Sequence, residues 1–300
     1  MADSPVRKPA WLRVNLQTSE SFAQVRRQIR TGKLNTVCEE ARCPNIYECW
    51  GVHKTATFMI LGSVCTRRCR FCAVATGLPT EMDEAEPARV AESVAQMGLR
   101  HAVVTMVARD DLRDGGAGVL ADTVEQIHAR VPGCRVEVLA SDFNASRQAI
   151  ATLVASRPEI VSHNMETVPR LTPLVRSHST YETSLSFLRI ARELAPTRVT
   201  KSSLMVGLGE TTAEIHGVMD DLRSVGVDML NIGQYLQPTR THVAVARYWH
   251  PDEFEELKAT AQEKGFSHCE SGPFVRSSYH AEEQFSCVSP TAEQTGSSTR

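Results

Sequence analysis

From Thr57 onward, the sequence alternates between short apolar runs and longer segments with apolar residues every three or four positions. This alternation constrains the fold more than any other feature, because the runs have strand length and the longer segments have the helical period. The predicted strands span residues 57–61, 101–105, 135–139, 159–163, 199–206 and 229–235. The predicted helices span 86–97, 119–131, 145–155, 181–194, 213–225 and 254–264, and a short strand is predicted near Phe266.

Strands that are separated by helices pair in parallel through right-handed crossovers. A doubly wound sheet and a full or partial barrel both satisfy this pattern. In either fold the binding site lies at the carboxyl ends of the strands. We expect residues 1–56 to form an irregular extension with one short helix at 21–30. We expect 57–250 to form the main α/β unit, 251–288 a C-terminal helix and closing segment, and 289–300 a disordered polar tail.

Composition excludes several functional classes. The formal net charge is −2, so nothing favours bulk attraction to nucleic acid or to an anionic membrane. No apolar run approaches the length of a membrane span, and residues 1–13 have no apolar core of a secretory signal. We therefore expect a cytoplasmic protein. The nine cysteines are an odd total in a large chain, which argues against a disulfide framework and favours metal binding.

The most specific cysteine pattern follows the first predicted strand. Cys65, Cys69 and Cys72 form a CxxxCxxC run on one short loop. Three thiolates at this spacing can bind three irons of a cubane cluster and leave the fourth iron open to a small molecule. The alternative is a structural zinc site, although zinc usually takes four ligands from paired CxxC hooks.

A second triplet precedes the first. Cys38, Cys43 and Cys49 are spaced CxxxxCxxxxxC, and Pro44 with its polar neighbours suits a loop. If this triplet holds a second cluster, a fourth ligand has to come from elsewhere in the chain. The alternatives are inert thiols or a zinc knuckle.

The two spacings together resemble those of lipoyl synthases, a family of the radical S-adenosylmethionine superfamily. The resemblance extends from about residue 35 to 281 and includes RDDLRDGGA at 109–117, MVGLGET at 205–211, GQYLQPTR at 233–240 and GPFVRSSYHA at 272–281. It implies an α/β fold, a partial (β/α)6 TIM-like barrel with a cysteine-rich N-terminal extension and a short C-terminal extension.

The resemblance also implies the cofactors, the reaction and the partners. The cofactors are two 4Fe-4S clusters and S-adenosyl-L-methionine. The first triplet would generate a deoxyadenosyl radical, and the second cluster would donate two sulfur atoms to carbons 6 and 8 of an octanoyl group on a lysine. The implied partners are octanoylated lipoyl-carrier domains (dehydrogenase-complex acyltransferase subunits and the glycine cleavage H protein), flavodoxin or ferredoxin as electron donor, and an iron-sulfur carrier for cluster repair.

Further site residues follow from the resemblance alone. The RSSY motif at 276–279 implies Ser278, in preference to Ser277, as the fourth ligand of the second cluster. The motif HNME at 163–166 implies that Asn164 and Glu166 face the cofactor's ribose, with a helix cap as the alternative. The cofactor candidates are Thr105, Asn164, Glu166, Gly207, Gly209 and Glu210; the last three also fit a plain βα turn.

Several other polar residues permit more than one interpretation. Arg240 and Arg109 could face the substrate or form surface ion pairs. Asp110, Asp111 and Asp114 could bind a divalent cation, but they more simply cap the following helix. Family members usually read TSVDRDDL where this chain has Met106 and Ala108, so the contacts of this loop are in question. The histidines at 101, 216, 242 and 268 and the cysteines at 134, 269 and 287 show no ligand pattern.

Other functions compete with this one. A different radical sulfur-inserting enzyme, such as one similar to biotin synthase, would share the first triplet. An enzyme that modifies tRNA would carry a basic RNA-binding domain, which this sequence lacks. A non-catalytic iron–sulfur protein would not need a βα unit of this size. A zinc-stabilised binding module would lack the brown colour expected of iron–sulfur clusters in anaerobically purified protein.

Overall fold

The computed structural model describes residues 7–14, 18–79 and 81–288, so the predicted tail at 289–300 lies outside the described residues. Its main sheet has the strand order β1-β2-β5-β6-β7-β8-β9-β10. From β2 to β10 every neighbouring pair is parallel, and only β1 is antiparallel to its neighbour. The strands are β1 (Asn35–Thr36), β2 (Thr57–Ile60), β5 (His101–Met106), β6 (Arg135–Leu139), β7 (Ile160–Ser162), β8 (Val199–Val206), β9 (Met229–Gln234) and β10 (His268–Gly272).

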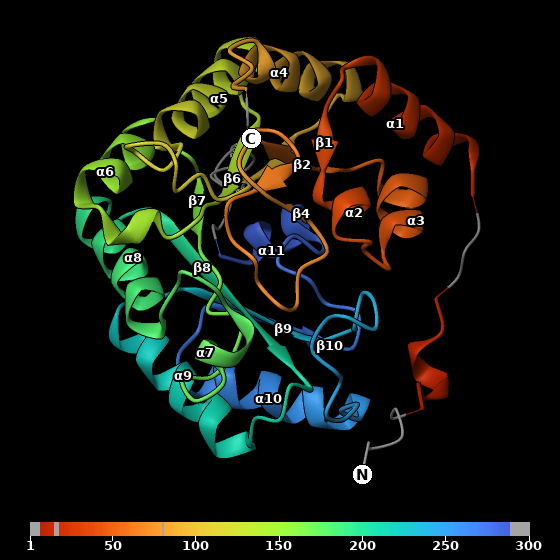
Figure 1. Cartoon of the computed structure of the whole chain (residues 1–300), viewed down its shortest axis with the longest axis vertical. Helices are drawn as coiled ribbons and strands as arrows, with labels where there is room; N and C mark the ends of the chain where they lie inside the picture. The colour runs from red at the N-terminus through yellow and green to blue at the C-terminus, as the bar shows by residue number, and fades with distance from the viewer. Residues whose placement is uncertain (1–6, 15–17, 80, 289–300) are drawn as a thin grey trace, which may run out of the picture.

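The sheet curves into a partial barrel with helices around its outside (Figure 1). Within the described residues, the edge strands β1 and β10 do not pair with each other, so the barrel stays open. The six predicted strands are confirmed, and the short strand expected near Phe266 is β10, two residues later. The outer helices are α4 (Glu86–Met97), α5 (Ala117–Arg130), α6 (Arg147–Ala155), α8 (Tyr181–Leu194), α9 (Thr212–Ser224) and α10 (Pro251–Glu263).

The strands are mostly buried because helices cover one face and the barrel interior covers the other. All residues of β2 and β9 are buried. The six outer helices are confirmed, with bounds that differ from the predicted ones by at most three residues. Thr211 and Glu214 form the predicted capping box of α9, and Gly98 ends α4 in a left-handed conformation.

The N-terminal extension is more regular than predicted. Besides α1 (Glu20–Thr31), it contains α2 (Val37–Glu40), α3 (Ile46–Glu48) and the π-helical turn η2 (Cys49–His53). The expectation of an irregular segment with a single helix was therefore wrong. These elements have only three to five residues each, too few for a repeating hydrophobic pattern, so periodicity could not reveal them. They lie on the side of the barrel between β1 and β10 (Figure 1).

The C-terminal segment returns to the barrel. After β10 the chain passes through residues 273–280 and forms α11 (Ala281–Val288), which contacts β5 and β10 and lies inside the ring of helices (Figure 1). The remaining elements are short: η1 (Ala10–Leu12), β3 (Val64–Cys65), β4 (Ala75–Thr76), η3 (Phe143–Ala145) and α7 (Thr172–Val175). No helix within the described ranges is both long and apolar enough to span a membrane.

Candidate active site

All six cysteines of the two triplets line one cavity, whose volume is about 660 Å³. The cavity lies at the carboxyl ends of the barrel strands and is bordered by the N-terminal extension and by residues 276–283. Of the other predicted site residues, its lining includes Thr105, Asn164, Glu166, Ser277 and Ser278. The fold thus places the two cysteine triplets, which lie on separate short segments of the sequence, around the same cavity.

The first triplet lies on the loop that leaves β2. Backbone N–H groups of Leu61 and Gly62 donate to the carboxylate of Glu86, at 2.6 and 3.4 Å. Glu86 is buried, and this burial raises the pKa of its carboxyl group above the ordinary value. The carboxylate at the start of α4 therefore fixes the point where the chain turns from the strand into the cysteine loop. From the sequence, Glu86 was predicted only to begin a helix.

An ionic clamp holds the middle of this loop. Arg67 lies between Cys65 and Cys69, is 7% exposed, and donates to Asp110 at 2.7 Å and to Asp142 at 2.7 Å. The Arg67 guanidinium holds the pKa of both carboxyl groups below the usual range, although burial of Asp142 acts in the opposite direction. The loop is thus tied to the ends of β5 and β6.

Two further contacts close the loop. Thr66 donates from its backbone N–H and its hydroxyl to the carbonyl oxygen of Ala108, both at 3.0 Å. An imidazole nitrogen of His242 lies 2.9 Å from the carbonyl oxygen of Cys72. Because the contact to residue 108 uses its backbone, the departure from the family sequence at Ala108 leaves this contact in place. Met106 and Ala108 both line the cavity.

The second triplet lies mostly on helices, although the sequence suggested a loop. Cys38 is in α2, Cys49 begins η2, and Cys43 lies on the turn between α2 and α3. Burial raises the pKa of the Cys38 thiol to about 12, and it raises the pKa values of Cys43 and Cys49 as well. Neighbouring thiolates in the triplet raise the pKa of Cys38 and Cys49 further. Such thiols stay protonated unless a cationic centre replaces their protons.

The segment from 273 to 280 is fixed against the second triplet from two sides. The side-chain amide of Asn231 on β9 donates to the carbonyl oxygens of Arg276 and Ser277, at 2.9 and 3.1 Å. The amide of Asn45 donates to the carbonyl oxygen of Phe274 at 2.7 Å. Gly233 leaves room for this packing, since a Cβ there would lie 2.0 Å from the carbonyl oxygen of Val275.

The two serines of this segment face different partners. The hydroxyl of Thr57 donates to Ser278 at 2.8 Å, and Thr57 also lies beside Cys38, where its hydrogen bonds act on the thiol. The amide of Asn164 donates to the hydroxyl of Ser277 at 2.8 Å. Ser278 is therefore on the side of the second triplet, whereas Ser277 is on the side of the predicted cofactor contacts. The sequence alone separated these two serines poorly.

The predicted ribose contacts form a buried polar group. Asn164 donates to Glu166 at 3.1 Å, while its own side-chain oxygen is buried and has no partner among the described residues. Burial raises the pKa of the Glu166 carboxyl group, and the nearby Arg176 guanidinium opposes this shift. Glu166 adopts a positive φ of 68°, a conformation that costs energy in a residue with a side chain. The unpaired acceptor fits a ligand that donates hydrogen bonds. Thr105, the remaining candidate, donates to the carbonyl oxygen of Leu139 at 2.9 Å.

The Gly207–Glu210 segment has a different position. Among the described residues that line the cavity, Gly207, Gly209 and Glu210 are absent. The Glu210 carboxylate instead accepts from the N–H of Gly207 at 2.5 Å and from the indole of Trp249 at 2.9 Å. A Cβ on Gly207 would lie 2.6 Å from the carbonyl oxygen of Arg247. These contacts give the segment the role of a packed turn, and its contact with a cofactor stays a prediction.

Other predicted polar residues form local pairs. Arg109 is buried, does not line the cavity and pairs with Asp111 at 2.8 Å; Arg240 is exposed and also outside the lining. Asp114 caps the start of α5 by accepting from Gly116 and Gly118, as predicted. The expectation that Asp110 and Asp111 also serve as caps was wrong, because both carboxylates bind arginines.

The roles of two cationic residues of the site were not predicted from the sequence. Arg276, in the RSSY motif, lines the cavity beside the second triplet. Burial lowers the pKa of its guanidinium, and the Cys43 thiolate opposes this shift. Arg176 donates to the carbonyl oxygen of Asn164 at 3.2 Å. Burial raises the pKa of the nearby Cys69 thiol, and the Arg176 guanidinium opposes this shift. Arg176 belongs to no motif, and the RSSY motif suggested a serine ligand and gave no role to Arg276, so only the tertiary structure placed these two cations beside the cysteines.

The donor set fits iron–sulfur clusters. All nine cysteines are free. Burial raises the thiol pKa of five of the six in the cavity: Cys38, Cys43, Cys49, Cys69 and Cys72. Each triplet has a cation beside it, Arg176 at the first and Arg276 at the second, as an anionic thiolate cluster requires. Cys134, Cys269 and Cys287 do not line the cavity.

Comparisons with known proteins agree with this geometry. The radical SAM superfamily matches residues 59–222, and the N-terminal domain of lipoyl synthase matches residues 2–43. A lipoyl synthase from Halalkalibacterium halodurans is 62% identical over 279 residues, which are 93% of this chain and 92% of that protein. The lipoyl synthase of Bacillus subtilis (strain 168) is 60% identical over 282 residues, which are 94% and 95% of the two chains.

Solved structures share the fold at low sequence identity. Methylornithine synthase has a TM-score of 0.51 at 12% identity and covers 63% of this chain and 56% of its own. HydG, a maturase of the [FeFe]-hydrogenase, has a TM-score of 0.52 at 15% identity and covers 67% of this chain and 47% of its own. These two likenesses support the partial-barrel fold and nothing finer.

Proposed function

Because the chain belongs to the lipoyl synthase family of radical S-adenosylmethionine enzymes, we propose that it inserts two sulfur atoms at carbons 6 and 8 of a protein-bound octanoyl-lysine. In this proposal Cys65, Cys69 and Cys72 hold the 4Fe-4S cluster that binds S-adenosylmethionine. A second 4Fe-4S cluster is held by Cys38, Cys43, Cys49 and Ser278. When bound, these groups supply the one-electron chemistry and the sulfur that protein side chains cannot supply.

One observation carries the proposal: both cysteine triplets line the same cavity of about 660 Å³. An electron carrier needs no space between two metal centres, whereas sulfur insertion requires that the substrate carbon reach both the cofactor and the sulfur donor. A cavity of this size lies within the usual range for sites that enclose small ligands.

The chain's own residues bind the reactants and exclude water. Apolar side chains of Val103, Leu139 and Met205 line the cavity and suit an alkyl chain. The free oxygen of Asn164 offers an acceptor for a cofactor hydroxyl, and the hydroxyl of Ser277 holds the Asn164 amide in place. Tertiary contacts that fix these polar groups keep the reactants at a defined distance, which is how a protein scaffold accelerates such a reaction.

The partners follow from this substrate. We propose octanoylated lipoyl-carrier domains as substrates, a flavodoxin or ferredoxin as the reductant, and an iron-sulfur carrier that restores the second cluster.

The Cys43→Ala variant separates the two triplets. After anaerobic reconstitution, we expect it to cleave S-adenosylmethionine reductively and to form no lipoyl product, because only the second cluster loses a ligand. Cys134→Ala is the control, since Cys134 is also a buried free cysteine but does not line the cavity. Lipoyl formation by the Cys43→Ala variant would show that the second triplet is not the sulfur donor.

A further inference from the structure

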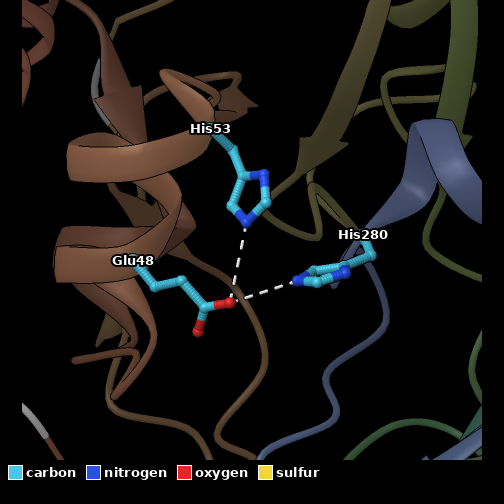
Figure 2. Close-up of side chains that lie close together, drawn as sticks. All are labelled: Glu48, His53 and His280. Atoms are coloured by element: carbon cyan, nitrogen blue, oxygen red, sulfur yellow. Dashed lines mark hydrogen bonds and ion pairs between the residues drawn. The ribbon is translucent and has the colours of Figure 1, made fainter.

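Three metal-ligating side chains lie together beside the second triplet: Glu48, the last residue of α3, His53, the last of η2, and His280, which directly precedes α11 (Figure 2). A Glu48 carboxylate oxygen lies 3.6 Å from Nε2 of His53 and 3.2 Å from Nε2 of His280. All three ligand atoms are within 4.8 Å of one another. Both histidines line the cavity, and Glu48 is the neighbour of Cys49.

The separations suit adjacent ligands of one ion. Nitrogen and oxygen ligands bind a first-row divalent metal at about 2.1 Å, so two ligands at a right angle lie about 3.0 Å apart. Wider angles increase that separation, and the observed 3.2 and 3.6 Å fall within this range. Two histidines and one carboxylate on one side of an ion, with open positions opposite, form a typical site for non-haem ferrous iron.

The hydrogen bonds of His280 favour a cation at its Nε2. Its Nδ1 lies 2.9 Å from the carboxylate of Glu283, and its Nε2 lies 3.2 Å from that of Glu48. A neutral imidazole has one N–H and can donate to only one of these carboxylates. With the N–H toward Glu283, the Nε2 lone pair faces the Glu48 oxygen, an arrangement that a cation between the two atoms stabilises. Histidines that ligate metals commonly donate their other nitrogen to a carboxylate in this way.

The backbone at His280 is also strained. Its φ is +50°, a left-handed conformation that is costly for a residue with a side chain. Next to it, the hydroxyl of Tyr279 donates to Glu48 at 3.1 Å. These contacts join the C-terminal segment to α3 at the point where the three ligand atoms meet, so the group is held together by tertiary structure from both chain ends.

We propose that Glu48, His53 and His280 bind one ferrous ion at the rim of the cavity. The ion would be held next to Cys49 without a change of oxidation state, and its open coordination positions would allow transfer to the cysteines by ligand exchange. The site itself depends only on these three residues; its use as an iron store for the second cluster rests on the proposed function.

The test uses isotope-selective Mössbauer spectroscopy on protein whose clusters contain natural-abundance iron. After anaerobic titration with ⁵⁷Fe²⁺ and removal of unbound iron, we expect one high-spin ferrous ion per chain. His53→Ala and His280→Ala should each weaken ⁵⁷Fe²⁺ binding by at least tenfold. His128→Ala is the matched control, because His128 has the same side-chain exposure as His280, 28%, and also pairs with a glutamate, Glu159.

Several outcomes would overturn the site: no bound ⁵⁷Fe²⁺ in the parent protein, equal binding in the His53→Ala variant, or an equal loss in the His128→Ala control. A protonated His280 would satisfy both carboxylates without metal and would give the first of these. Cluster iron and sulfide, measured in the same samples, show whether each variant has folded. The cluster iron and sulfide content depends on the cysteine ligands and not on the ferrous site. Failure of the ferrous site therefore does not contradict the proposed function.

Discussion

The two cysteine triplets border one cavity, but the molecule holds them in different ways. The first lies on a loop of the barrel and is fixed by neighbouring strand ends, through Glu86 and the Arg67 clamp. The second lies on short helices outside the sheet and faces a segment from the other end of the chain, which Asn231 and Asn45 hold in place. The first triplet therefore depends on the barrel alone, and the second on the association of both chain ends with it.

This difference suits the proposed roles. A cluster that must survive repeated turnover benefits from a rigid support within the fold. A cluster that loses sulfur and is rebuilt needs ligands that can open, and a site assembled from two chain ends can separate locally at less cost than one in the barrel. Variants that damage only one of the two supports test this interpretation.

The largest effect is expected from Arg67→Ala. It leaves the buried Asp142 carboxylate without its cationic partner, and loss of one member of a buried ion pair costs about 3–5 kcal/mol of unfolding free energy. We expect lower stability in anaerobic urea unfolding, together with loss of iron from the first triplet. Arg170→Ala removes a solvent-exposed pair with Glu214 and should cost far less unfolding free energy, because water screens exposed ion pairs. Equal losses in the two variants would contradict the clamp.

A smaller and more local effect is expected from Gly233→Ala. The new Cβ would lie 2.0 Å from the carbonyl oxygen of Val275, and overpacking of this kind costs about 1–3 kcal/mol. We expect the segment that contains Ser278 to shift, so that iron is lost from the second triplet while S-adenosylmethionine cleavage continues. The control is Gly217→Ala, where a Cβ would meet nothing within 4 Å. If the Gly233→Ala variant retained both clusters, close packing at Gly233 would not be needed for the second cluster site.

Asn231→Ala should weaken the same support without introducing a clash. It removes the donor to the carbonyl oxygens of Arg276 and Ser277, at a cost of about 1–3 kcal/mol for unsatisfied buried acceptors. We expect partial rather than complete loss of iron from the second triplet, measured by iron and sulfide analysis. Loss of iron from the first triplet alone would contradict the assignment of Asn231 as a support of the second triplet.

The finest distinction is between the two serines. Ser278→Ala should alter the Mössbauer spectrum of the second cluster and leave the affinity for S-adenosylmethionine unchanged. Ser277→Ala removes the acceptor of the Asn164 amide, and a hydrogen bond worth about 1 kcal/mol corresponds to about fivefold weaker cofactor binding. Equilibrium binding and spectroscopy on both variants would sharpen the assignment, and exchanged phenotypes would make Ser277 the ligand.

The sequence by itself determined the barrel strands, the outer helices and both cysteine triplets. These features depend on local information, because apolar periodicity defines each strand or helix and cysteine spacing defines each group of ligands. The strand at 135–139 and the helix at 181–194 were predicted to the residue.

Only the tertiary structure decided how these parts meet. Arg67 with Asp142, Asn164 with Ser277 and Glu48 with His280 are separated by 75, 113 and 232 positions in the sequence. No periodicity links such pairs, and their contacts exist only once the strand ends and both chain ends have been brought together around the cavity. The spacing of the cysteines along the chain therefore identifies the ligands, whereas the arrangement of the site depends on contacts between distant residues, which form only when the chain folds.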